Sequence, residues 1–297
     1  MELTVCETPL LSLTAIARAR TFELDRLVAH LRACAGPVSR EIVVGVETAG
    51  AAAPTEAVDD DGVRWIALPP RRGIGYNRER VLEAVRGDIA VSVDDDCIPE
   101  GDWLTELLSA LDDSTIDAAV GRVTVPPAGL LGDSISALGF PAGGSAGYET
   151  MFLVREDGTT DNVSCGNFAI RTAVLREVGG YDESMVHGGE DTELAYRLNT
   201  SGRRIAFVPT AAIVHPARTS LREFARWFYV RGRAKRQFSR KIPSTGYVAR
   251  RLASYGRILR SNLLDLKIVL IVPLLFASVA LQQAGFVIET IRPTHRP

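Results

Sequence analysis

Residues 84–111 have the sequence AVRGDIAVSVDDDCIPEGDWLTELLSAL, and this stretch decides the fold. Its apolar run Ile89–Val93 predicts a short buried strand, which leads directly into three consecutive aspartates at 94–96. Asp102 then stands where a cap would begin a helix over 103–111. A buried strand, an acidic turn and a helix in this order are typical of α/β folds, whose ligands bind at the carboxyl ends of the strands.

The sequence before this stretch repeats the alternation of strands and helices. Short apolar runs bounded by turn residues predict strands over 3–6, 41–46 and 63–68, and amphipathic stretches predict helices over 24–35 and 75–86. Strands that are separated by helices indicate a parallel sheet covered on both faces. We therefore expect an α/β fold.

The sequence after residue 125 is less regular, because Pro and Gly are frequent in it. The elements that it predicts are, in order, a loop over 126–147, a strand over 150–154, a helix capped by Thr172, a helix beginning near Glu190, and strands over 204–208 and 211–214.

Charge is distributed unevenly along the 297 residues. The first 216 residues hold 18 basic and 33 acidic side chains, whereas residues 217–297 hold 16 basic and 3 acidic ones, and the net charge is −2. The acidic part argues against nucleic acid as a partner. The basic part by itself would suit nucleic acid or the phosphates of a membrane surface.

The cysteines and the N-terminus indicate a cellular compartment. Cys6, Cys34, Cys97 and Cys165 form no CxxC pair, so the sequence predicts neither a zinc site nor a disulfide framework, and it fits a reducing compartment. The first residues lack the charged and then apolar pattern of a signal peptide. We expect the body of the protein to lie in the cytosol.

An apolar segment near the C-terminus predicts contact with a membrane. Residues 268–288 carry no charged side chain, and about 20 mainly apolar residues suffice to span a bilayer. The alternative is an amphipathic or core-packed helix. The basic residues of 217–267 precede the segment, which by the positive-inside rule places the body on the cytoplasmic side of the cell membrane. We expect a catalytic domain over 1–216, a basic helical region over 217–267, and a membrane helix with a short tail over 268–297.

Three groups of residues could carry chemistry. Asp94, Asp95 and Asp96 repel one another unless a cation or hydrogen-bond donors neutralise them, and Mg²⁺ or Mn²⁺ shared with substrate phosphates would do so. The alternative is an acidic loop that precedes a helix cap. Glu190 and Asp191 open a helix, as caps or as a general base that deprotonates a hydroxyl.

His215 is the third candidate. It ends a predicted strand, and it is followed by Pro216. A single histidine is usually an ordinary surface or core residue, but a neutral imidazole here could complete the ligand shell of a metal beside Asp96.

These segments together resemble family 2 glycosyltransferases. Residues 84–111 are similar to the aspartate-motif region of that family, and residues 165–216, CGNFAIRTAVLREVGGYDESMVHGGEDTELAYRLNTSGRRIAFVPTAAIVHP, are similar to its acceptor-side block. The resemblance covers about residues 1–235. It implies a GT-A-like, Rossmann-type mixed sheet flanked by helices, and an inverting enzyme that uses a nucleotide-sugar donor with Mn²⁺ or Mg²⁺.

The resemblance also implies roles for individual residues. Asp96 and His215 would bind the metal, and Asp191 would be the catalytic base, with Glu190 supporting it or the acceptor. Trp227 would stack on a sugar or simply pack in its helix. The residues expected to bind the donor are Glu47, Arg78, Asp94, Asp95, Gly166, Asn167, Arg231 and Arg233.

The sequence departs from the family pattern in the half that would hold the nucleotide base. The residues at 6–9 and 46–49 differ from the usual turns after the first two strands, so Glu47 is the only acid available there, and Glu79 stands where the family has Asn. The metal and acceptor half keeps the pattern.

The expected function is sugar transfer from a nucleoside diphosphate sugar to an acceptor hydroxyl. The acceptor would be a membrane-linked glycan or lipid in cell-envelope or exopolysaccharide synthesis. The alternative is a catalytically inactive, membrane-tethered sugar-binding subunit of a polysaccharide assembly. A nucleotidyltransferase is disfavoured because the first 17 residues contain no Lys, Arg or Gly for a phosphate loop.

Overall fold

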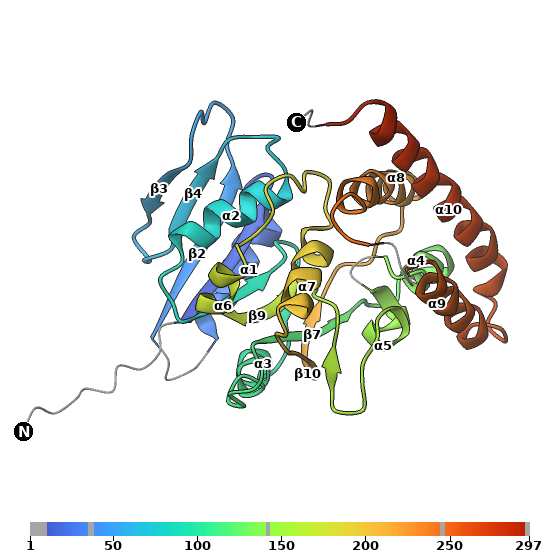
Figure 1. Cartoon of the computed structure of the whole chain (residues 1–297), viewed down its shortest axis with the longest axis horizontal. Helices are drawn as coiled ribbons and strands as arrows, with labels where there is room; N and C mark the ends of the chain where they lie inside the picture. The colour runs from blue at the N-terminus through green and yellow to red at the C-terminus, as the bar shows by residue number, and fades with distance from the viewer. Residues whose placement is uncertain (1–10, 35–38, 141–142, 244–246, 295–297) are drawn as a thin grey trace, which may run out of the picture.

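The structure of the chain is a computed structural model that describes residues 11–34, 39–140, 143–243 and 247–294. These residues form one ten-stranded mixed sheet with helices around it (Figure 1). The strands are β1 Leu11–Ala17, β2 Arg40–Glu47, β3 Thr55–Val58, β4 Arg64–Leu68, β5 Ile89–Val93, β6 Ile98–Pro99, β7 Ala118–Thr124, β8 Thr159–Thr160, β9 Asn167–Arg171 and β10 Ile205–Val214. The helices are α1 Phe22–Ala33, α2 Ile74–Ala84, α3 Trp103–Ser109, α4 Gly129–Ala137, the 3₁₀ turn η1 Gly144–Ala146, α5 Tyr148–Met151, α6 Thr172–Glu177, α7 Glu190–Thr200, α8 Leu221–Phe238, α9 Tyr247–Ser261 and α10 Ile268–Ile291.

The order of the strands brings the ends of several elements to one edge of the sheet. The order is β3-β4-β2-β1-β5-β9-β7-β10-β6, with β8 beside β10. Strands β4, β2, β1 and β5 are parallel, β9 is antiparallel to both of its neighbours, and β7 and β10 are parallel to each other. The carboxyl ends of β5, β7 and β10 therefore lie on the same edge as those of β1 and β2.

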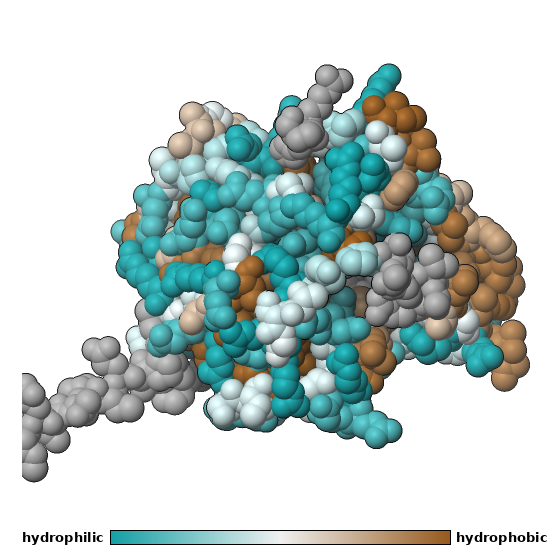
Figure 2. Space-filling view, viewed as in Figure 1, coloured by the Kyte–Doolittle hydropathy of each residue, from teal (hydrophilic) through white to brown (hydrophobic). Residues whose placement is uncertain are grey.

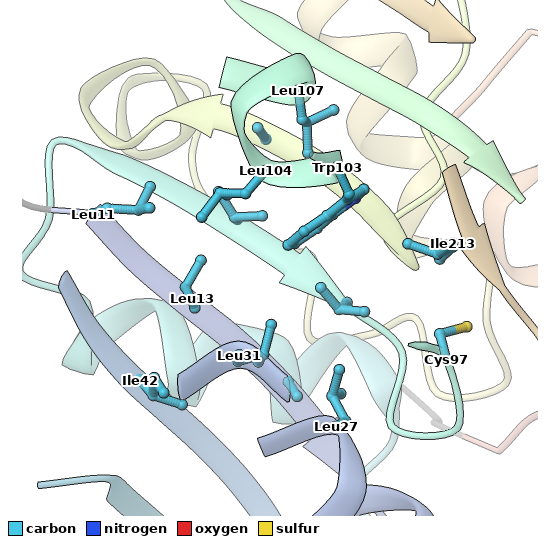
Figure 3. Packing of buried hydrophobic residues seen from close by; sticks show 14 of the residues in the cluster. Leu11, Leu13, Leu27, Leu31, Ile42, Cys97, Trp103, Leu104, Leu107 and Ile213 are labelled. Atoms are coloured by element: carbon cyan, nitrogen blue, oxygen red, sulfur yellow. The ribbon is translucent and has the colours of Figure 1, made fainter. Parts of the chain in front are cut away.

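Apolar side chains cover both faces of the sheet, as the alternation of strands and helices predicts. On one face, Leu13 of β1 packs with Leu27 and Leu31 of α1 and with Trp103 of α3 (Figure 3). On the other face, residues of α2, α6 and α7 pack against Phe168 of β9 and against neighbouring strands. Successive side chains of a strand point to opposite faces, so one short strand contributes side chains to the packing on both faces of the sheet.

Most of the elements expected before residue 112 are confirmed, with shifts of a few residues at their ends. The exception is the first strand. Its predicted position, 3–6, lies outside the described residues, and the strand at the centre of the sheet is β1. The turn that follows β1 is therefore 18–21, which holds Arg18 and Arg20, and not 6–9.

Three predictions for the second half are wrong in detail. The segment 126–147 contains α4, because the apolar residues of that helix pack against the C-terminal helices. The predicted strand over 150–154 begins inside α5, and only Val154 forms an isolated bridge. The strands over 204–208 and 211–214 are one strand, β10, with a shift of register between Val208 and Ala212.

Two predicted caps also differ. Asp102 occupies the N-cap position of α3, but its side chain accepts no capping hydrogen bond, and Thr172 is the first residue of α6 rather than its cap. The C-terminal region is helical as expected. Helices α8, α9 and α10 lie together on one side of the molecule (Figure 1), and α10 is long and apolar enough to cross a membrane by length and composition.

Candidate functional site

The acidic turn after β5 is held against the turn that precedes β9. The backbone N–H of Asp94 donates to the carbonyl oxygen of Gly166 over 3.3 Å. A Cβ atom at position 166 would lie 2.4 Å from Oδ2 of Asp94, which is closer than any side chain allows. Glycine at position 166 therefore permits the close approach, and its role is to shape the site rather than to offer a side chain.

Arg78, on α2, connects the acidic turn to the start of α7. Its side chain is only 5% exposed, and it donates to Oε1 of Glu190 over 3.1 Å and to Oδ1 of Asp94 over 3.1 Å. A third bond, over 2.7 Å, reaches the hydroxyl of Ser92 in β5. The buried guanidinium of Arg78 fixes the positions of the two carboxylates and the hydroxyl, because charge-assisted hydrogen bonds are strong where water is excluded.

The two acids at the start of α7 differ in burial. Glu190 is buried, and this burial, followed by the repulsion of Asp191, raises the pKa of Glu190 to about 7 against the attraction of Arg78. Asp191 is only half-buried, and its Oδ1 accepts from the backbone N–H of Thr192 over 2.6 Å. Asp191 is therefore the acid that an incoming hydroxyl can reach, while Glu190 stays inside.

Asp96 and His215 form the part of the site that fits a metal ion. Nε2 of His215 lies 3.2 Å from Oδ1 of Asp96, and Nδ1 of the same ring lies 2.9 Å from the carbonyl oxygen of Pro216. A carbonyl can only accept, so in the neutral ring Nδ1 carries the proton and Nε2 presents a lone pair. Two acceptor atoms that face each other are satisfied by a cation between them, and a ligand His oriented by a carbonyl is usual at metal sites.

Cys97 lies beside this pair. One candidate ligand atom from each of Asp96, Cys97 and His215 falls within 4.8 Å of the others. Burial, and then the three neighbouring aspartates, raise the pKa of the Cys97 thiol well above its usual value. Since only the thiolate is a good ligand, the fit rests on Asp96 and His215.

Asp95 lies between the donor-side and metal-side acids. Burial, and then repulsion from Asp96 and Asp94, raise its pKa to about 6. Three adjacent acids whose charges disfavour one another fit a site for a cation, and that site stays a prediction.

Arg218 is a residue of the site that the sequence reading missed. It follows β10 by four residues and forms an ion pair with Oδ2 of Asp96. A possible signal was its position only three residues after His215, at the edge where the strands end.

Glu47, the acid expected to hold the nucleoside, ends β2 on the same edge. Its Oε1 accepts from the side chain of Asn77 over 3.0 Å, and its Oε2 from the backbone N–H of Arg71 over 3.3 Å. Glu79, which replaces the usual Asn, instead accepts from the backbone N–H of Tyr181. This hydrogen bond fixes the loop that precedes α7, so Glu79 has a structural role here.

Asn167 has a different position from the one expected of a residue that lines the donor pocket. It is completely buried, and its amide donates to the carbonyl oxygens of Arg122 and Ala211. Its Oδ1 accepts from the indole N–H of Trp103 over 2.7 Å. Asn167 therefore ties β9 to β7, β10 and α3, and it supports the sheet instead of facing a ligand.

The two arginines expected at the diphosphate also have other partners. Arg233 binds Glu289 of α10 over 2.7 Å, and the guanidinium carbon of Arg231 lies 4.6 Å from the centre of the Trp227 ring. Neither of these interactions involves the acidic turn. Trp227 itself packs 4.4 Å from the ring centre of Phe140, as the packing interpretation predicts.

Comparisons with known proteins identify the family and the fold of the chain. The family model described as "Glycosyltransferase like family 2" matches residues 15–238. The pre-mycofactocin glycosyltransferase of Mycobacterium tuberculosis is 27% identical over 68% of this chain and 48% of its own length. The chain thus spans about half the length of this curated relative.

Solved structures share the fold at low identity. The mannosyltransferase PcManGT from Pyrobaculum calidifontis, in complex with GDP-Man and Mn²⁺, superimposes with a TM-score of 0.59 at 14% identity, over 98% of this chain and 89% of its own. S. aureus TarS 1-349, in complex with UDP-GlcNAc, superimposes with a TM-score of 0.53 at 11% identity, over 97% of this chain and 93% of its own.

Proposed function

Because the chain belongs to the glycosyltransferase family 2 proteins whose model it matches, we propose that it is an inverting glycosyltransferase that uses a nucleoside diphosphate sugar. The observation that carries the proposal is the convergence on Arg78. This one buried side chain binds both the donor-side acid, Asp94, and Glu190 beside the candidate base, 16 and 112 residues away in sequence. A structure that only needed stability would not concentrate so many charges at one edge of the sheet.

Each group has a role that follows from its place. Asp94 and Glu47, at the ends of β5 and β2, would bind hydroxyls of the donor, and Asp96 and His215 would hold a divalent cation. When bound, such a cation supplies positive charge that stabilises the departing nucleoside diphosphate. Arg218, whose guanidinium already contacts Asp96, would bind a phosphate oxygen on the same side.

The chemical step uses the half-buried acid at the start of α7. Asp191 takes the proton of the acceptor hydroxyl, and the oxygen forms a bond to the anomeric carbon from the face opposite the diphosphate. The bond between that carbon and the diphosphate oxygen breaks, and its electron pair leaves with the nucleotide. One attack from the opposite face inverts the anomeric configuration. A positioned base contributes about 10²–10⁴-fold in rate.

The acceptor that we propose is a membrane-linked glycan or lipid in envelope or exopolysaccharide synthesis. The support is the apolar helix α10, together with the excess of basic residues after residue 216. The same excess supports a catalytic domain, 1–216, on the cytoplasmic side of the cell membrane, whose leaflet is anionic, with 217–267 as its basic juxtamembrane region.

The experiment is a transfer assay with purified protein. A panel of UDP- and GDP-sugars is offered with Mn²⁺, with Mg²⁺ and with chelator, and release of the nucleoside diphosphate is measured. We expect Asp191→Asn to lose about 10²–10⁴-fold in turnover while it still binds donor. Full turnover in that variant would reject the base, and activity unaffected by chelator or by Asp96→Ala would reject the metal. Donor binding without turnover under every condition would favour the sugar-binding subunit instead.

A further inference from the structure

Helix α10 has its polar side turned toward the protein and its apolar side turned outward. The residues that face the body recur every three or four positions, and the row becomes polar along the helix: Ile271, Leu274, Ser278, Gln282, Gly285 and Glu289. The outward face carries Val269, Phe276 and Ile291, which are 65%, 73% and 67% exposed. A helix on a protein in water has the opposite arrangement, so this outer face is suited to apolar surroundings.

The contact between α10 and α8 is close and fixed. A Cβ atom at Gly232 would lie 2.0 Å from the carbonyl oxygen of Gln282, and one at Gly285 would lie 2.0 Å from that of Tyr229. The two helix backbones therefore touch at this crossing, with no room for a side chain on either helix. Helix α10 cannot move away from α8 without opening this crossing.

Charged and polar side chains also hold α10 against α8, outside the crossing of the two backbones. Glu289 is 3% exposed and accepts from Arg233 of α8, from the side chain of Gln237 and from Thr294. Separating the two helices would break these charge-assisted hydrogen bonds, which is unfavourable.

Helix α8 is in turn tied to the catalytic domain, because the side chain of its Gln237 accepts from the backbone N–H groups of Val186 and His187, and α8 carries exposed charges. It begins six residues after His215, and Arg222, Arg226 and Arg231 are exposed on it. Charged side chains are costly in the hydrocarbon of a bilayer. Because α10 lies along α8, a crossing of the bilayer by α10 would carry these arginines into the membrane.

The link between α9 and α10, which we call the leucine tip (263–266), presents three exposed leucines and Asp265, whose carboxylate is paired with Lys267. Leu263, Leu264 and Leu266 are 67%, 101% and 72% exposed. Arg260 and Lys267 stand on either side of the tip in sequence. The brown surface over α10 in Figure 2 shows the outer face of the helix on one side of the molecule.

We propose that the outer face of α10 and the leucine tip form a monotopic docking surface that lies in the interface of an anionic lipid bilayer. This inference deepens the membrane contact of the proposed function. Helices that lie in a membrane plane combine an apolar face with nearby basic residues, as here. A second copy of the chain fits less well, because pairing would bring together two regions with 16 basic and 3 acidic residues each.

The binding test uses full-length protein and vesicles of phosphatidylglycerol with phosphatidylcholine, without donor or metal. We expect Phe276→Asp to weaken co-sedimentation at least about tenfold. Phe22→Asp is the matched control, since Phe22 is 72% exposed on α1, and it should bind as the unaltered chain does. Equal binding of the two variants, or no binding of the unaltered chain, would overturn the docking surface. A dimer in solution that Phe276→Asp dissociates, without vesicle binding, would do the same.

A depth measurement separates lying on the membrane from crossing it. Single labels are placed through Val269→Cys, Ala280→Cys and Ile291→Cys, in a chain with Cys6 and Cys34 replaced by serine, and are quenched by lipids that carry quenchers at known depths. We expect all three labels at one shallow depth in one leaflet. A label at Ala280 near the bilayer centre, with the other two in opposite leaflets, would show that α10 spans. Because neither test needs turnover, their failure is distinct from failure of the sugar transfer.

Discussion

Arg78 and Arg233 each bind a buried carboxylate, that of Glu190 and that of Glu289, and the two arginines serve different ends. Arg78 lies under the edge of the sheet, 5% exposed, and its partner Asp94 is one-third exposed. Arg233 lies between α8 and α10, and its partner Glu289 is 3% exposed. The first ion pair is open on the carboxylate side, which leaves Asp94 accessible from solvent. The second is closed on that side and only joins two helices.

The difference indicates that the burial of an ion pair decides whether it is structural or can contact a ligand. A closed pair stabilises one arrangement of the chain, and removing one partner leaves the other unpaired. An open pair orients a carboxylate that still has a free side for substrate. If burial decides the use of each charge, removing Arg78 and removing Arg233 should have separate effects.

The largest effect is expected at Arg78. Arg78→Met leaves Glu190 buried beside Asp191 and frees Asp94, so we expect unfolding to become easier by about 3–5 kcal/mol, together with loss of donor binding. Chemical denaturation and donor titration measure the two quantities. A variant that is stable and binds donor normally would show that the contacts of Arg78 with Glu190 and Asp94 do not hold the site together.

Glu190, the buried partner of Arg78, should make the stability of the protein depend on pH. Its pKa is about 7 in the folded chain against 4.5 for the ordinary carboxyl, so the folded state binds more protons between these values. The free energy of unfolding should therefore fall as pH rises from about 4.5 through about 7, relative to Glu190→Gln, by up to about 3 kcal/mol. Parallel stability curves for the two proteins would contradict the raised pKa.

A substitution at the crossing of α8 and α10 tests the closed helix contact in which Arg233 lies. Gly285→Ala forces a Cβ onto the carbonyl oxygen of Tyr229, so we expect α10 to be destabilised by about 1–3 kcal/mol. Gly256→Ala on α9 is the matched control, because a Cβ there meets no atom within 4 Å, and alanine should be neutral or stabilise the helix. Hydrogen exchange in α10 measures both, and equal exchange would argue against the close crossing.

The smallest effect is expected at Arg233. Because its side chain is 23% exposed, water compensates part of the loss in Arg233→Met, and we expect about 1–2 kcal/mol confined to α10. Donor binding should be unchanged, which hydrogen exchange and a donor titration can show together. A loss of donor binding would mean that the two arginines are not separate.

How much the sequence reveals depends on how local each feature is. The strand β5 and the aspartates after it could be predicted, because the apolar run and the acids are adjacent in the chain. The same holds for Glu190 at the start of α7. Sequence reasoning missed strand β1, although Leu11 and Leu13 alternate with Ser12 and Thr14 in its sequence LSLTAIA, because it assigned the first strand to the apolar run over 3–6.

The features that could not be predicted depend on distant partners. Helix α4 lies in a stretch rich in Gly and Pro, and it is held by apolar contacts with the C-terminal helices. The pair of Arg233 with Glu289 joins residues 56 positions apart, and Asn167 is buried by three other elements. The family resemblance suggested a ligand at Arg233 and Asn167, but in the structure both side chains make tertiary contacts.

The most direct test of the account is the binding of Mn²⁺ in the presence of UDP or GDP, followed through the free ion by electron paramagnetic resonance. The account predicts that the nucleotide tightens Mn²⁺ binding, that Asp96→Ala and His215→Ala each weaken it at least about tenfold, and that Arg233→Met leaves it unchanged. Unaltered Mn²⁺ binding in both Asp96→Ala and His215→Ala would contradict the site.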